Sequence, residues 1–158
     1  MMNIRAAKPS DLTQILTILN EVSRDLQEKG VNQWNYPWDQ EPIEEALKQN
    51  QAFMLTLGNH VIGTFFISEI DAISTCTINP QSFYLSKVAL SPEYQRKNFG
   101  AKIMKFALIY AEKQHKPVYL DCWAGNDRLK TFYKTHGFDY LGDYPEANYS
   151  ISVFRGKS

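Results

Sequence analysis

The stretch of sequence that decides the fold covers residues 87–101 and reads KVALSPEYQRKNFGA. Its apolar start is typical of a strand that ends at Ser91-Pro92, and an apolar stripe with helical spacing begins at Phe99. A short loop therefore runs from a strand directly into an amphipathic helix. Because the first turn of a helix carries unpaired N–H groups and the positive end of the helix dipole, this loop is suited to bind an anion.

The residues of this loop add to its capacity for anion binding. Asn98 and Gly100 both tolerate a positive φ angle, which lets successive backbone amides converge on one ligand. Arg96 and Lys97 bring positive charge to the same place. The alternative is an ordinary turn between a strand and a helix in which both basic side chains are solvated, and these residues alone leave the two alternatives open.

Hydrophobic periodicity on either side of the loop predicts a chain in which strands and helices alternate. Helices are expected at residues 12–26, 42–47, 99–110 and 129–136, and strands at residues 3–6, 52–57, 61–70, 83–90, 118–123, 138–141 and 149–154. Ser10 is expected to cap the first helix, Gly30 to end it, and Pro42 to open the second. This order implies an α/β domain with a mixed sheet and helices on its faces.

Composition and charge exclude several classes of protein. The chain has 158 residues, the size of one ordinary domain, with 17 Lys and Arg against 17 Asp and Glu, whereas a general nucleic-acid binder would show a basic excess. Two cysteines, Cys76 and Cys122, are fewer than a disulfide-stapled secreted domain usually has. No signal-peptide core or membrane-spanning stretch is present. We expect a cytoplasmic protein with reduced thiols and with no nucleic-acid or membrane partner, and a homodimer stays open.

A second segment, residues 121–138, reads DCWAGNDRLKTFYKTHGF. It combines a strand, then Asn126, then a helix with Phe132-Tyr133, then Gly137-Phe138. In order and spacing the two segments resemble motifs A and B of the GNAT acetyltransferases, and the resemblance covers residues 84–138. It implies that residues 1–158 form a single α/β domain with a GNAT-like fold, in which a mixed, mostly antiparallel central sheet has helices on both faces.

The resemblance also implies a binding site for acetyl-CoA. In the family the loop holds the coenzyme pyrophosphate, and the preceding strand pairs with the pantetheine arm. The residues expected to bind the coenzyme are Val88, Ala89, Leu90, Gln95, Arg96, Lys97, Asn98, Phe99, Gly100, Ala101, Asn126 and Tyr133. Asn98 departs from the family pattern because it stands where a glycine is usual, but Asn is the commonest other residue to adopt the left-handed conformation.

The reaction implied by the resemblance is direct attack of an amine on the acetyl-CoA thioester. A backbone N–H near Val88 would stabilise the carbonyl oxygen, and Tyr133 would be the general acid for the departing thiolate. Taken without the motif, Tyr133 lies on an apolar stripe and is typical of a core tyrosine. Asn126 is expected to be a helix N-cap in either case.

Other residue types that carry chemistry give no decisive signal. The general base is open between three carboxylates, Glu69, Asp71 and Asp121. Cys122 is expected to be a small buried hydrophobe. The three histidines are not spaced with carboxylates or cysteines as metal ligands would be, so no metal is expected.

The irregular segment at residues 31–41 contains Trp34, Tyr36 and Trp38. We expect these aromatic residues to line the acceptor pocket and to favour a small amine; the alternative is that they cap the core against the first helix. The function expected is transfer of an acetyl group from acetyl-CoA to a primary amine of a small molecule. Two alternatives remain, a non-catalytic acyl-CoA-binding regulatory domain and a peptide or protein N-acetyltransferase, which would need an open groove.

Overall fold

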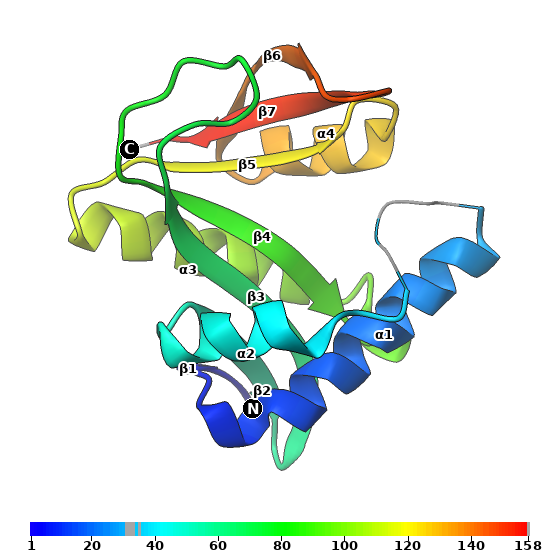
Figure 1. Cartoon of the computed structure of the whole chain (residues 1–158). Helices are drawn as coiled ribbons and strands as arrows, with labels where there is room; N and C mark the ends of the chain where they lie inside the picture. The colour runs from blue at the N-terminus through cyan, green and yellow to red at the C-terminus, as the bar shows by residue number, and fades with distance from the viewer. Residues whose placement is uncertain (31–33, 35, 158) are drawn as a thin grey trace. The chain divides into compact units, whose positions relative to one another are not determined.

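The structure is a computed structural model that describes residues 1–30, 34 and 36–157. Its elements follow the predicted order, with two short 3-10 turns added. The helices are α1 (Leu12–Glu28), α2 (Gln40–Lys48), α3 (Phe99–Lys113) and α4 (Asp127–Thr135), and the 3-10 turns are η1 (Pro9–Asp11) and η2 (Pro92–Tyr94). The strands are β1 (Met2–Ala6), β2 (Ala52–Leu57), β3 (His60–Ile70), β4 (Ser82–Leu90), β5 (Val118–Trp123), β6 (Phe138–Pro145) and β7 (Ser150–Gly156) (Figure 1).

Within the described residues the strands form one sheet in the order β1-β2-β3-β4-β5-β7-β6. The pairs β1–β2, β2–β3, β5–β7 and β6–β7 are antiparallel, whereas β4 and β5 are parallel. This confirms the mixed, mostly antiparallel sheet of an α/β fold. The chain divides into two compact units, each built from two separate segments: Met1–Phe66 with Lys87–Gly100, and Ile67–Ser86 with Ala101–Ser158.

The first unit is built around α1 and α2, which pack side by side (Figure 1). The apolar faces of both helices supply its core: Ile15, Leu19 and Val22 from α1 and Ile43 and Leu47 from α2 are buried. They meet Met54 on β2 and other small or apolar residues in the same cluster. This packing explains the helical spacing of the apolar residues that predicted both helices.

The two helix starts in this unit differ from the prediction. Ser10 does not cap α1, because Pro9 opens a 3-10 turn and the cap falls on Asp11. The Asp11 carboxylate accepts hydrogen bonds from the Arg5 guanidinium at 2.9 and 3.1 Å and from the backbone N–H of Lys8 at 2.8 Å. Helix α2 begins at Gln40, two residues before Pro42. Proline is tolerated there because the first N–H groups of a helix have no intrahelical partner.

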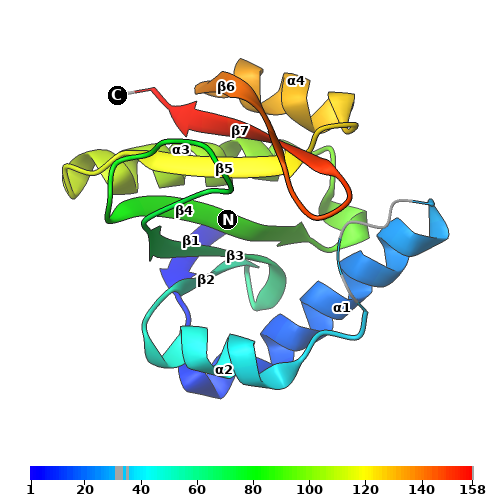
Figure 2. The same cartoon turned by 45° about the horizontal axis from the view of Figure 1, so that its top comes forward.

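The second unit contains β5, β7 and β6, with α4 against β6 (Figure 2). Strand β5 pairs with β7 so that Tyr119, Asp121 and Trp123 lie opposite Arg155, Val153 and Ile151. Residues directly opposite in an antiparallel pair share a face, so these six side chains lie on one face of the sheet. The other face carries Phe154, against which the ring of Tyr133 packs from α4 at 5.4 Å between centroids. Strand β5 therefore presents Asp121 on one face and Cys122 on the other.

Candidate active site

The loop between β4 and α3 is shaped by its backbone. Gln95 connects the loop to the end of β4, because its side-chain amide donates a hydrogen bond to the carbonyl oxygen of Leu90 at 3.0 Å. Arg96 and Asn98 both have positive φ angles, 63° and 68°. The prediction is confirmed for Asn98. For Gly100 it is wrong, because Gly100 lies in the first turn of α3, and Arg96 is the second left-handed residue instead.

The loop also concentrates positive charge. The side chains of Arg96, Lys97 and Asn98 are exposed, and the 15-residue helix α3 begins directly after them. Lys97 Nζ lies 5.9 Å from the ring centroid of Tyr94, so the ammonium stays next to the loop. Left-handed residues, a helix N-terminus and two exposed cations together form the type of site that binds phosphate groups.

Strand β4 has an irregularity that the sequence did not reveal. Lys87 has a φ angle of 51° in the middle of the strand, a conformation that is rare for a long side chain and is typical of a bulge. Its side chain is partly buried, its ammonium lies 5.1 Å from the ring centroid of Phe66, and burial lowers its pKa. This left-handed residue comes one position before Val88, whose backbone N–H the family resemblance implicates.

Helix α4 positions Asn126 and Tyr133. Asn126 is the N-cap, as predicted, and its side-chain oxygen accepts a hydrogen bond from the backbone N–H of Leu129 at 3.1 Å. Tyr133 is buried, and burial, followed by the charges of Cys122 and Asp121, raises the pKa of its hydroxyl. The hydroxyl is therefore protonated at neutral pH and can act as a donor.

The Tyr133 hydroxyl is also accessible. Among the described residues it has no hydrogen-bond partner. Yet no fully buried side-chain oxygen or nitrogen in that part of the chain lacks a partner. The ring is thus buried while the hydroxyl reaches solvent, which is the arrangement that a donor to a bound ligand needs.

A pair of side chains that the sequence did not indicate links β4 to β5. The Tyr84 hydroxyl lies 2.9 and 3.0 Å from the two carboxylate oxygens of Asp121. Burial raises the pKa of Asp121, the hydrogen bond from Tyr84 lowers it, and the charge of Glu146 raises it. Burial, followed by the charge of Asp121, also raises the pKa of Tyr84. The two residues are 37 positions apart, so no local motif could reveal the pair.

The chain is similar to known proteins of one family. Residues 17–138 match the model of the acetyltransferase (GNAT) family. The chain belongs to the GNAT family. The uncharacterized N-acetyltransferase YesJ of Bacillus subtilis is 22% identical over 143 residues, which cover 84% of this chain and 78% of that protein. This GNAT chain is therefore an acetyl-CoA-dependent N-acetyltransferase.

Solved GNAT structures share the fold at low sequence identity. A GNAT acetyltransferase from Listeria monocytogenes has a TM-score of 0.79 and 20% identity, covering 98% of this chain and 93% of its own. The ribosomal-protein-S18-alanine N-acetyltransferase of Escherichia coli has a TM-score of 0.72 and 16% identity, covering 98% of this chain and 92% of its own. At these identities the likeness establishes the fold alone.

Two of the three aromatic residues predicted to contact the acceptor in this GNAT enzyme pack against the core of the first unit. The indole N–H of Trp38 donates to Ser23 Oγ at 2.7 Å, and its ring meets Trp34 edge-on at 5.5 Å. Tyr36 is 42% exposed. Residues 31–33 and 35 of this segment lie outside the described residues. Trp34 and Trp38 thus occupy the core-capping position of the alternative, and contact with the acceptor stays a prediction.

The other two candidate bases, Glu69 and Asp71, have partners of their own. Glu69 forms an ion pair with Lys116 at 3.0 Å, and Asp71 accepts a hydrogen bond from the backbone N–H of Gln81 at 2.8 Å.

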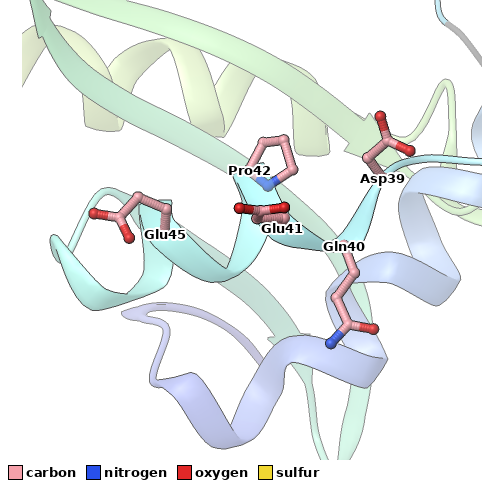
Figure 3. A pocket seen from close by; sticks show the side chains of 5 residues that line it. All are labelled: Asp39, Gln40, Glu41, Pro42 and Glu45. Carbon is pink, nitrogen blue, oxygen red and sulfur yellow. The ribbon is translucent and has the colours of Figure 1, made fainter.

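A surface hollow lies beside the start of α2. It is lined by Asp39, Gln40, Glu41, Pro42 and Glu45, and it contains no residue predicted to bind the coenzyme (Figure 3).

In the part of the chain that the structure describes, no group of histidine, cysteine and carboxylate side chains is arranged to hold a metal ion. No helix there has the length and apolar character needed to cross a membrane.

Proposed function

We propose that this GNAT enzyme, acting as one domain, transfers the acetyl group of acetyl-CoA to a primary amine of a small molecule by direct attack. The observation that carries the proposal is the loop at residues 95–98, where Arg96 and Asn98 are left-handed directly before the N-terminus of α3. A doubly charged pyrophosphate is the coenzyme group that such a backbone would bind.

The chain's own groups suit the proposed coenzyme. Arg96 and Lys97 are exposed and would offset the phosphate charge, while the amides at Asn98, Phe99 and Gly100 are at the start of α3, where they need an acceptor. Ala101 continues the same turn, and Gln95 would hold the loop closed by its bond to Leu90. The backbone of residues 88–90 would pair with the pantetheine arm, and Asn126 is also proposed to bind the coenzyme.

The proposed chemistry needs a donor at each place where negative charge develops. Acetyl-CoA supplies the activated acetyl group. A backbone N–H near Val88, next to the left-handed residue Lys87, would donate to the carbonyl oxygen. The Tyr133 hydroxyl, whose raised pKa keeps it protonated, would donate its proton to the departing sulfur. Cys122 is a poor nucleophile, because burial raises the pKa of its thiol to about 11, which fits a reaction without a covalent enzyme intermediate.

The acceptor is the part of the proposal that the fold leaves open. The E. coli enzyme of the same fold acts on an alanine of a ribosomal protein, so the fold serves more than one acceptor class. The alternative is therefore acetylation of a peptide or protein. A small amine is favoured by the aromatic ring of Tyr36, which is 42% exposed and is available to contact an acceptor.

The test is release of CoA thiol from acetyl-CoA by the wild-type protein across polyamines, amino acids, aminoglycosides and a histone-like peptide. Reactions without the protein give the uncatalysed release of thiol. The proposal expects turnover on at least one small amine and a lower rate on the peptide. Turnover on the peptide alone would replace it with the peptide alternative. Binding of acetyl-CoA without turnover on any of these acceptors would contradict the proposal.

A further inference from the structure

We propose that Asp121 is the general base that takes the proton from the acceptor's ammonium group, and that Tyr84 is a positioning residue that holds its carboxylate. This inference rests on the proposed function, because it needs an amine acceptor. It selects one of the three carboxylates that the sequence left open as general base. It also implies that the acceptor amine is protonated when it binds.

The hydrogen bonding of Asp121 leaves it able to bind a further donor. The Tyr84 hydroxyl lies within bonding distance of both carboxylate oxygens, but it carries one proton and can satisfy only one oxygen at a time. In the described residues no lysine, arginine or histidine forms an ion pair with Asp121. A largely buried carboxylate with unused acceptor sites and no internal cation is suited to an external ammonium group.

The other two carboxylates lack this property. Glu69 already holds Lys116, and more than half of its side chain is exposed. Asp71 is exposed and accepts a backbone N–H within its own loop. Neither is held by a side chain of a neighbouring strand, as Asp121 is held by Tyr84.

The position of Asp121 relative to Tyr133 suits the two proton transfers of the reaction. Asp121 lies on the face of β5 that carries Tyr119 and Trp123, whereas Tyr133 packs on Phe154, on the opposite face. Asp121 still raises the pKa of Tyr133, so the two groups lie within electrostatic range. Acetyl transfer needs a proton removed from nitrogen and another delivered to sulfur, and the proposal gives these two tasks to two separate groups, Asp121 on β5 and Tyr133 on α4.

The proposed step balances as follows. Asp121 accepts one proton from the ammonium group, which leaves a neutral amine with a free electron pair. The nitrogen bonds to the acetyl carbon, and the carbon–sulfur bond breaks with its electron pair on sulfur. Sulfur receives a proton from Tyr133, and the phenolate is reprotonated by the second proton that nitrogen loses. Asp121 releases its proton to solvent, so the products are an amide, free CoA thiol and one proton.

The pH dependence follows from the groups that face Asp121. Tyr84 on β4 lowers its pKa by a hydrogen bond, and Glu146 in the turn between β6 and β7 raises it by charge. Tyr133 and Cys122 are neutral at neutral pH because the pKa of each is raised. A base works only when it is deprotonated, so activity should fall as the pH falls through the pKa of Asp121. Loss of the Tyr84 hydroxyl should therefore move this acid limb to higher pH.

The experiment measures kcat against pH for the wild type, Asp121→Asn and Tyr84→Phe, on an amine that the wild type acetylates. Tyr119→Phe is the matched control, since Tyr119 is a buried tyrosine two residues before Asp121 on the same face of β5. Asp121→Asn should lower kcat at neutral pH about 10²–10⁴-fold, the usual contribution of a general base, and should regain activity as rising pH deprotonates the free amine. Tyr84→Phe should shift the acid limb upward, and Tyr119→Phe should leave it in place.

Binding of acetyl-CoA, followed by its thermal shift, separates failure of this inference from failure of the proposed function. All variants should keep the wild-type shift, which also shows that they fold. An active wild type whose Asp121→Asn variant keeps the wild-type kcat and acid limb would overturn the inference alone. Equal shifts of the limb in Tyr84→Phe and Tyr119→Phe would overturn the role of Tyr84. A wild type that acetylates no amine would overturn the proposed function, and this inference with it.

Discussion

The loop at residues 95–98 and the pair Tyr84–Asp121 are built by different means. The loop is contiguous and exposed, and its geometry is that of the backbone, with left-handed residues at Arg96 and Asn98 before α3. The pair is largely buried, joins two strands, and depends on two side chains that are 37 residues apart. Sites of the first kind can be recognised in a sequence, because the residues are consecutive. Sites of the second kind become visible only when the strand order is known.

The largest effect is expected where the buried side chains act on the reaction. Tyr133→Phe removes one oxygen and keeps the ring against Phe154. If the hydroxyl protonates the departing sulfur, kcat should fall about 10²–10⁴-fold, and KM for acetyl-CoA should stay nearly constant. Steady-state kinetics and a melting curve measure both. Full activity in a folded variant would return Tyr133 to the role of a core tyrosine.

A smaller effect is expected where the backbone loop binds the coenzyme. Gly100 is in the first turn of α3, where a side chain would hinder close approach of the pyrophosphate. Gly100→Val should raise Kd for CoA about 10- to 100-fold, which corresponds to the loss of one hydrogen bond to a charged group, ~1.5–3 kcal/mol. Calorimetric titration gives the value, and the unliganded melting temperature is the control. An unchanged Kd would mean that the phosphates bind elsewhere.

The aromatic segment should give a smaller change, and it can show whether the side chains bind the acceptor or cap the core. Trp38 donates to Ser23 and packs on Trp34, so Trp38→Ala should lower the melting temperature by several degrees. Tyr36 is exposed, so Tyr36→Ala should leave stability unchanged and raise KM for the amine a few-fold. A rise in KM for the amine in Trp38→Ala, without loss of stability, would restore its predicted contact with the acceptor.

The smallest effect concerns the stability cost of the buried carboxylate. Burial raises the pKa of Asp121 in the folded state, so folding favours its protonated form. The resulting stabilisation is present below the unfolded pKa, about 3.9, and is lost as the pH rises through the folded pKa. Asp121→Asn should therefore melt at most a few degrees above the wild type at pH 7, and the difference should shrink toward pH 4. A variant that melts lower at pH 7 would contradict this.

The sequence predicted the elements well because their apolar residues repeat with clear periods. The strand at residues 118–123 has the predicted bounds, and Asn126 caps α4 as expected. Backbone exceptions were harder to predict. Nothing local signals that Lys87 or Arg96 is left-handed, because both residue types usually avoid that conformation.

The predictions about side-chain partners failed in a different way. Serine is a residue type that often caps helices, but a 3-10 turn begins at Pro9, next to Ser10. The N-cap of α1 is therefore Asp11, whose carboxylate also binds Arg5. Asp121 could not be separated from Glu69 by sequence, since its partner Tyr84 comes from another strand. The sequence therefore predicted which residues are candidates for the site. The order of the strands in the sheet determines which of these residues are in contact.

The central claim is that the left-handed backbone at Asn98 lets the loop bind the coenzyme pyrophosphate, and calorimetric titration tests it most directly. CoA and pantetheine, which lacks the pyrophosphate, are titrated into the wild type, Asn98→Gly and Asn98→Val. We predict that Asn98→Gly binds CoA as tightly as the wild type or more so, because glycine accepts a φ of 68°. A β-branched residue is strained there, so Asn98→Val should lose affinity for CoA and leave pantetheine binding unchanged. Equal affinity of the three proteins for CoA, or parallel losses for CoA and pantetheine, would contradict the account.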